Sequence, residues 1–262
     1  MKIAVLMKQV ADCDAKSSEI GGALRSAETT SLNPSDVYAL ETAIAKKREN
    51  GAEVSAFTMG PAHASAVLTE ACRLGADALY LISDPLFGGA DTFVTAKILK
   101  RALDQQGAFD LVICGERAID GETGQVPGEL AAMMDVPFAT SVVEMNGTEG
   151  QTLVCRCLTE NATEDTEVKM PCVLGISCGM QGVGHPVIPG LRDLARARNT
   201  QITVLDNTIL GFLPEEVGLA GSLTRVKRVH KVSWVRESKR VADVGDAVRE
   251  TVRVLTEIRG TP

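Results

Sequence analysis

The sequence predicts an α/β fold whose sheet is doubly wound and mainly parallel, and three observations lead to this prediction. Short apolar runs alternate with helical patterns up to about residue 140. The runs have the length of strands that are buried on both faces of a sheet. The connections between runs and helices are short, which is typical of parallel strands joined by crossover helices.

The elements of the first half follow one another in a regular order. We expect the first strand at 2–8, and we read the polar, glycine-bearing stretch at 11–30 as a long loop or a hairpin. Asn33-Pro34-Ser35-Asp36 predicts a helix start, because it combines a capping side chain, an early proline and an acid. The remaining strands are expected at 53–59, 78–82 and 111–114, and the helices at about 63–74, 91–105 and from 126 onward.

The pattern changes after Pro137. Two strand-like runs at 140–145 and 152–158 flank Asn146-Gly147, which is a strong signal for a hairpin turn. Further strands are expected at 167–170 and 171–177, followed by a glycine-rich segment at 179–190 and a basic helix at 191–198. A last helix at 239–258 carries one apolar stripe on a charged surface.

These patterns divide the chain into two parts. Residues 1–210 are expected to form the α/β domain, and residues 211–262 a C-terminal arm and helix. The stripe of the last helix indicates that the arm docks on another surface. The alternative, that the helix packs on its own domain, stays open at this point.

Composition excludes several classes of function. The chain has 262 residues with 45% apolar side chains, so a substantial core is expected. A net charge of −7 and 3% aromatic residues argue against nucleic-acid binding. We expect a cytoplasmic protein without membrane insertion, because no run has the length of a span and the N-terminus has no signal-peptide layout. The seven cysteines fit no metal-site spacing, so no metal is expected.

The stretch from Asp110 to Pro137 has the layout of a ligand site. An apolar strand ends at Gly115, a polar loop with Asp120, Glu122 and Thr123 follows, and a short helix starts at about Val126. At the carboxyl ends of the strands of an open α/β sheet, backbone N–H groups of such a helix start bind phosphate oxygens, and loop side chains bind a sugar or base. An ordinary strand-to-helix turn that binds nothing has the same layout, so both readings stay open.

A second loop, Phe87-Gly88-Gly89-Ala90-Asp91-Thr92, is similar to the S-G-G-x-D-S loop of ATP pyrophosphatases. It differs because it follows the third strand and begins with Phe87. Paired glycines can lie flat against a flavin or a phosphate, whereas the simpler alternative is a tight connection with Asp91 as the helix N-cap. No catalytic motif occurs elsewhere, which indicates a carrier or binding subunit.

Several segments together resemble the beta subunit of electron-transfer flavoproteins. They are the opening Met1–Val10 strand, Leu32-Asn33-Pro34, Met59-Gly60-Pro61, Leu74-Gly75-Ala76-Asp77 and, as the most specific match, Gly115-x-x-Ala118-Ile119-Asp120 with Gln125. The resemblance implies a sheet of the adenine-nucleotide alpha-hydrolase-like type and a heterodimer with an alpha subunit that carries FAD. Ordinary members hold AMP in the beta subunit, and the electron-bifurcating group holds a second FAD that meets NADH. The Gly88-Gly89 loop favours the FAD-binding group.

The resemblance also implies which residues bind the cofactor. Leu6, Asn33 and Met59 would line the adenine and ribose, and the loop from Ala118 onward would wrap the phosphates. The full expected set is Leu6, Asn33, Met59, Phe87, Gly88, Gly89, Ala90, Asp91, Thr92, Cys114, Gly115, Ala118, Ile119, Asp120, Gly121, Glu122, Thr123, Gly124, Gln125, Val126 and Gly128. No residue is expected to be catalytic.

Partner recognition is implied by His185-Pro186-Val187-Ile188-Pro189-Gly190-Leu191. It occupies the place of the family's E-P-R-Y-P-type recognition segment for flavin-dependent dehydrogenases, with Leu191 as the anchoring leucine. His185, Val187 and Ile188 depart from the family's Glu, Arg and Tyr. Two other functions stay open on the same fold: an adenylating enzyme that uses ATP, and an adenine-nucleotide sensor.

Overall fold

The computed structural model describes residues 1–11, 17–18, 22–23, 30–179, 188–197, 200–227 and 240–259. The chain forms two compact units, Met1–Arg228 and Val229–Pro262, and we describe each by itself. The division falls later than the boundary that we expected at residue 210. Most of the 11–30 loop and the His185-Pro186-Val187 part of the recognition segment lie outside the described residues.

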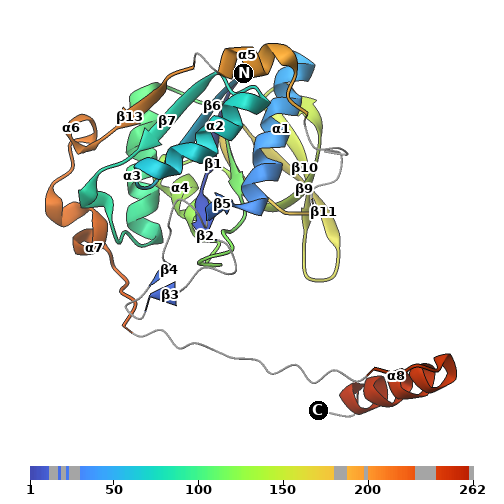
Figure 1. Cartoon of the computed structure of the whole chain (residues 1–262). Helices are drawn as coiled ribbons and strands as arrows, with labels where there is room; N and C mark the ends of the chain where they lie inside the picture. Colours follow the sequence, from blue (N-terminus) through green and yellow to red (C-terminus); the bar gives the residue numbers. More distant parts are fainter. Residues whose placement is uncertain are drawn as a thin grey trace. The chain divides into compact units, whose positions relative to one another are not determined.

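Unit 1 is built around a nine-stranded sheet with the order β11-β10-β9-β12-β8-β1-β6-β7-β13 (Figure 1). Neighbouring strands from β9 to β13 in this order are all parallel, and β10 and β11 add an antiparallel edge. This arrangement confirms the predicted α/β fold with a mainly parallel sheet. The strands are β1 (Lys2–Met7), β6 (Glu53–Met59), β7 (Ala78–Ile82), β8 (Leu111–Gly115), β9 (Phe138–Glu149), β10 (Thr152–Leu158), β11 (Thr163–Lys169), β12 (Cys172–Ile176) and β13 (Ile202–Leu205).

Helices cover both faces of this sheet, as doubly wound folds require. α1 (Pro34–Asn50) and α2 (Ser65–Leu74) contribute to one apolar core, and α3 (Thr92–Gln106) and α4 (Val126–Met134) to the other. Side chains of β1 alternate between the two cores, with Ile3 and Val5 on one face and Ala4 and Leu6 on the other. Along the chain, each of the four helices connects two strands of the sheet (Figure 1). The site described below lies at the carboxyl ends of strands in this sheet, which is covered on both faces.

Smaller elements complete unit 1. The short strands are β2 (Gln9–Ala11), which pairs with β5 (Thr30–Leu32), and β3 (Ser17–Ser18), which pairs with β4 (Gly22–Ala23). The 3-10 turns are η1 (Ala62–Ala64), η2 (Pro85–Phe87) and η3 (Pro214–Glu216), and the short helices are α5 (Leu191–Ala197), α6 (Asn207–Leu210) and α7 (Gly218–Gly221). No helix in the described ranges has the length and apolar character needed to span a membrane.

The expected hairpin turn at Asn146-Gly147 is wrong. β9 continues to Glu149, and the chain turns at Gly150, whose backbone is left-handed with a φ of 62°. Leu153 pairs with Thr148 and Cys155 with Met145, so Asn146-Gly147 falls at an irregularity of the ladder. Gly147 and Gly150 are both suited to a turn, and the pairing of Thr152 with Glu149 places the turn at Gly150.

Residues 202–227 are more ordered than the sequence indicated. β13 pairs with β7 and extends the sheet by one strand. After it, Leu210, Phe212 and Val217 are buried in the same core as α3 and α4. The Phe212 ring lies 4.8 Å from the Arg101 guanidinium and 5.4 Å from the Lys97 ammonium, which fixes this segment on α3.

Unit 2 contains one helix among its described residues, α8 (Val244–Arg259). Its exposed apolar side chains recur at helical spacing and include Val244, Val248, Val252 and Leu255. Charged pairs such as Arg253–Glu250 and Arg253–Glu257 occupy the other side. The predicted amphipathic C-terminal helix is thus present.

Candidate functional site

The candidate site lies where β1 and β8 end side by side in the sheet. The chain leaves β1 through α1 toward β6, whereas it leaves β8 through α4 toward β9 and β12 on the opposite side. The two connections diverge, so the carboxyl ends of β1 and β8 form the switch point at which open α/β sheets bind ligands. The predicted loop after Gly115 starts at this point.

A buried carboxylate joins the two strand ends. Asp36, in the first turn of α1, accepts a hydrogen bond from the Lys8 backbone N–H at 2.7 Å and one from the Gly115 N–H at 2.8 Å. The side chain is 4% exposed. Burial raises the pKa of Asp36 to about 6, although the two backbone hydrogen bonds act in the opposite direction. Asp36 was not among the predicted site residues.

Gly115 is required by this close approach. A Cβ at position 115 would lie 2.5 Å from both Asp36 Oδ1 and Ser35 Cβ. Such distances are impossible for non-bonded atoms, so α1 and the end of β8 meet only because residue 115 has no side chain. The predicted role of Gly115 in ending the strand is therefore also a packing role.

Asn33 fixes the loop that follows β8. Its Nδ2 donates to the Arg117 carbonyl at 3.0 Å, and its Oδ1 accepts from the Ile119 N–H at 3.2 Å. Asn33 is the N-cap of α1 by position, but its side chain makes no capping hydrogen bond to the helix. The amide that we expected to cap α1 holds the loop instead. Its predicted contact with a ligand stays a prediction.

Asp120 is tied to the end of β1. Its Oδ1 lies 2.7 Å from Lys8 Nζ, and its side chain is 5% exposed, against 40% for the lysine. Ala118 accepts hydrogen bonds from the Gly121 and Glu122 N–H groups, which makes a tight turn. Glu122 and Gly124 adopt left-handed backbone with φ of 49° and 63°. The loop is thus shaped by local turns and anchored by Asn33 and Lys8.

The outer part of the loop is open. Residues 121–125 are all exposed, and α4 begins directly after them at Val126. N–H groups in the first turn of a helix have no partners within the helix and face its N-terminal side. The predicted site residues Gly121, Thr123, Gln125, Val126 and Gly128 are therefore grouped around one helix N-terminus.

The second predicted loop, 87–92, is covered on one side by residues 218–224. The Leu219 N–H donates to the Gly88 carbonyl at 3.1 Å, and a Cβ at Gly89 would lie 3.2 Å from Leu219 Cβ. Phe87 is buried in the core. The flat glycine surface that we expected to meet a flavin is thus occupied by the chain itself on this side.

Asp91 is the N-cap of α3, as the simpler reading of the loop predicted. One carboxylate oxygen accepts from the Val94 N–H at 3.0 Å, and the other accepts from the Thr224 N–H at 2.9 Å. Burial acts to raise the pKa of Asp91, but these hydrogen bonds outweigh it and hold the pKa below its usual range. An ionised Asp91 therefore fastens residues 222–224 to the loop.

Thr92 connects the two predicted loops. Its Oγ1 lies 3.1 Å from Gln125 Oε1 and 3.1 Å from Glu129 Oε1. The second oxygen, Glu129 Oε2, is buried and has no hydrogen-bond partner among the described residues. Two acceptor oxygens thus share one hydroxyl donor between α3 and α4, and a donor added at Glu129 Oε2 would satisfy the third oxygen.

A small polar recess of about 150 Å³ opens beside the loop. It is lined by Glu116, Arg117, Glu122, Thr123, Gly124, Thr140 and Ser141. Arg117 is exposed, and Ser141 has a left-handed φ of 53°. No sequence signal pointed to Thr140 and Ser141, because β9 becomes a neighbour of this loop only through the parallel pairing of β9 with β12.

The remaining predicted residues lie in the core, at its margin or in α5. Leu6 and Cys114 are buried in the core shared by α3 and α4, and burial raises the pKa of the Cys114 thiol well above its usual range. Met59 is half-buried at the end of β6, and Ala90 is half-buried against the core. Leu191 begins α5 and is 87% exposed.

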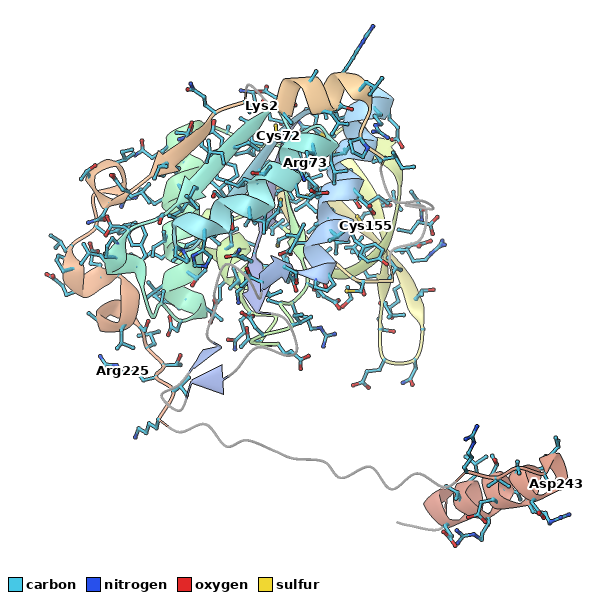
Figure 2. The ribbon with its side chains drawn as sticks, viewed as in Figure 1. Lys2, Cys72, Arg73, Cys155, Arg225 and Asp243 are labelled. Carbon is cyan, nitrogen blue, oxygen red and sulfur yellow. The ribbon has the colours of Figure 1, made fainter. Side chains whose placement is uncertain are left out.

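The cysteines of the described residues are all free thiols. Cys72 in α2 and Cys155 in β10, labelled in Figure 2, both belong to the apolar core on the α1 side of the sheet. The part of the chain that the structure describes contains no group of three or more residues arranged to hold a metal ion.

The chain is similar to known proteins over most of its length. The model of the electron transfer flavoprotein domain matches residues 22–208. An electron transfer flavoprotein subunit beta from Thermoanaerobacterium thermosaccharolyticum is 36% identical over 228 residues, which cover 86% of each chain. Subunit CarD of a caffeyl-CoA reductase–Etf complex from Acetobacterium woodii is 36% identical over 231 residues, or 87% of each chain. The electron transfer subunit gamma of an acryloyl-CoA reductase from Anaerotignum propionicum is 34% identical over 234 residues, or 86% of each chain.

Proposed function

The chain belongs to the electron transfer flavoprotein family, as a beta subunit, and from this premise we propose that it holds FAD at the β1–β8 edge and relays electrons. In this role it forms a heterodimer with an alpha subunit and acts between a flavin-dependent dehydrogenase or NADH and an acceptor. The observation that carries the proposal is the anchored loop 116–124, which leads into the N-terminus of α4 at the switch point.

The residues of the site fit the adenosine-phosphate half of such a ligand. N–H groups at the start of α4 and the exposed Thr123 hydroxyl are donors suited to phosphate oxygens. Lys8 and Arg117 carry positive charges beside the loop, and each is paired with an acid of the loop, Asp120 or Glu116. Asp120 keeps Lys8 in place, and its carboxylate is suited to accept from a ribose hydroxyl.

FAD is proposed in preference to AMP because polar groups continue beyond the loop. Thr92 and Glu129 lie between the starts of α3 and α4, and Glu129 Oε2 has no partner among the described residues. A ligand with a hydroxylated chain beyond the adenosine half would supply donors there. When bound, FAD supplies the electron-transfer chemistry through its ring system, and this chain's residues bind and orient it.

The test is to purify the chain in complex with its alpha subunit and to quantify the nucleotides that acid releases. Two FAD per heterodimer are expected. One FAD with one AMP would replace the FAD proposal by a structural AMP site. A complex without any nucleotide beyond the alpha subunit's FAD would contradict the site itself.

The same preparation separates the alternative functions. ATP-dependent release of pyrophosphate with Mg²⁺ would indicate an adenylating enzyme, and reversible ATP or AMP binding without flavin would indicate a sensor. Oxidation of NADH by the complex with two FAD would support NADH as the electron donor. A complex that does not oxidise NADH would leave the dehydrogenase as the donor.

We further propose that α5 takes part in recognition of the dehydrogenase. Leu191 and Ile188 are 87% and 78% exposed, so neither belongs to the core of this unit. Two exposed apolar side chains close together in sequence supply the kind of anchor that fills a partner's pocket.

A further inference from the structure

We propose that Asp36 is a positioning residue for the nucleotide site: its carboxylate holds the ends of β1 and β8 together. The inference rests on the proposed function, because the loop that Asp36 supports is the proposed ligand loop. Asp36 itself lies below the loop and is buried.

The geometry gives Asp36 two separate tasks. Oδ2 accepts from the Lys8 N–H, directly after β1, and Oδ1 accepts from the N–H of Gly115, the last residue of β8. These N–H groups lie at the two strand ends that diverge at the switch point. One carboxylate therefore fixes the spacing of the two strand ends from which the site is built.

Both strand ends lead directly to loop anchors. The Lys8 side chain reaches Asp120, and the loop that follows Gly115 is held at Arg117 and Ile119 by Asn33. Asn33 and Asp36 lie within one turn at the start of α1. The helix start thus holds β1, β8 and the loop as one assembly, and Asp36 supplies the bonds to both strands.

The carboxylate of Asp36 makes both bonds because it offers an acceptor on each oxygen. An amide in its place offers one acceptor oxygen and turns an NH2 group toward the other N–H donor. D36N therefore keeps one of the two strand contacts and leaves the other N–H group without an acceptor.

The charged and titratable groups around Asp36 are few among the described residues. Lys8, directly after β1, and Cys114, in β8, are the nearest. Cys178, which follows β12, contacts Ser35, the residue before Asp36. Asp120 lies beyond Lys8 in the loop. Lys8 stabilises the charged form, and the desolvation caused by burial opposes it more strongly.

The experiment measures how much of the beta-chain nucleotide the alpha–beta complex retains at pH 7.5, where Asp36 is ionised because its pKa is about 6. The variants are D36N and, as a matched control, E41Q, which changes another buried acid of α1. The natural chain and E41Q are expected to retain nucleotide equally.

D36N is expected to bind nucleotide roughly tenfold more weakly at pH 7.5, since it loses one hydrogen bond to a charged acceptor. Retention of nucleotide by D36N equal to that of the natural chain and of E41Q would overturn the proposal.

A second readout does not depend on the nucleotide. Hydrogen exchange of the backbone at 2–11 and 111–124 is expected to be about tenfold faster in D36N than in E41Q at pH 7.5. If no beta-chain nucleotide is found, the proposed function fails, and this comparison still decides the role of Asp36. Equal exchange in both variants at pH 7.5 would overturn it.

Discussion

At the scale of single residues, the site depends on a few polar side chains that bind backbone rather than one another. Asp36 and Asn33 together contact four backbone groups from β1, β8 and the following loop. Such contacts leave little freedom to the segments that they join, because a buried N–H or C=O without a partner is costly. Substitutions there are expected to affect binding more than fold.

Asp120→Ala provides the first prediction at this scale. Removing the carboxylate frees Lys8 Nζ, which lies 2.7 Å from Asp120 Oδ1, and detaches the loop from β1. The ion pair itself contributes less than about 1 kcal/mol, because Lys8 is partly exposed, so the variant remains folded. Nucleotide released per complex is expected to fall.

The matched control for Asp120→Ala is Asp104→Ala, which removes the acid of the Lys100–Asp104 pair on α3 at 2.6 Å. That variant should keep its nucleotide. Full occupancy in Asp120→Ala would remove the loop from the proposed site.

Asp36 also makes a prediction about stability and pH. Its pKa is 3.8 in the ordinary case and about 6 in the fold, so the folded chain binds this proton more tightly than the unfolded chain does. The fold therefore gains stability as the pH falls from 6 toward 4, and a pKa difference of about two corresponds to roughly 3 kcal/mol. The amide that D36N introduces cannot titrate, so this contribution is absent from the variant.

Urea denaturation of the natural chain and of D36N at several pH values checks this sign. The difference in unfolding free energy is expected to change in favour of the natural chain by roughly 3 kcal/mol between pH 7 and pH 4. A difference that stays constant over this range would show that Asp36 titrates normally in the fold.

At the scale of elements, the segment after β13 supports the loop before α3. Phe212 is 5% exposed, packs edge-on against Phe87 at 6.4 Å, and lies under Arg101 and Lys97. Residues 218–224, which follow a few positions later, bind the Gly88–Asp91 loop. A change at Phe212 is therefore expected to act on a loop far away in sequence.

Phe212→Ala should lower the unfolding free energy by about 3–5 kcal/mol, as truncation of a buried aromatic ring does. It should also increase hydrogen exchange at 88–92, where residues 218–224 are bound. The neighbouring Leu213, 58% exposed, serves as control, and Leu213→Ala is expected to change stability by less than about 0.5 kcal/mol. Equal effects of both substitutions would contradict the packing role of Phe212.

The elements that the sequence predicted well are those whose signals are local. The strands at 53–59 and 78–82 have the bounds that the apolar runs indicated, and the Asn33-Pro34 start of α1 is correct. β13 was missed because it is a short edge strand with Val204 half-exposed, and only its pairing with β7 identifies it.

The parts of the site that have local sequence signals could also be predicted, and the contacts between distant residues could not. The loop after Gly115 could be located from its composition, because a strand end, polar residues and a helix start are adjacent in sequence. The role of Asp36 could not be predicted, since it contacts Gly115 across 79 positions and only the strand order brings them together. The cover over Gly88 and Gly89 likewise comes from residues distant in sequence.

At the scale of the whole molecule, we expect two exposed apolar features, Leu191 on α5 and the stripe on α8, to bind partner proteins. Leu191→Asp is expected to slow electron exchange with the dehydrogenase while the nucleotide content stays unchanged, because Leu191 is exposed and does not contribute to the core. Stopped-flow reduction of the complex by the dehydrogenase measures this rate. Ala195→Asp, at an exposed position of the same helix, is the control. Identical rates in both variants would assign Leu191 to helix α5 alone.

The second feature is the stripe on α8, which we propose docks on the alpha subunit. Val248 and Val252 are each 58% exposed within a unit that contains no other described helix or strand, so burial of the stripe requires another surface. The double substitution Val248→Asp and Val252→Asp is expected to weaken alpha–beta association at least tenfold, because it would bury two charges in an apolar contact. Sedimentation velocity over a concentration series measures the association.

The control is Glu257→Lys, which reverses a charge on the opposite side of α8 and should leave association nearly unchanged. The melting of unit 1 is expected to be the same in both variants, since the core of that unit is formed by its own residues. If the double variant associates as tightly as the control, the stripe is not an alpha-subunit contact, and the heterodimer must be held by unit 1.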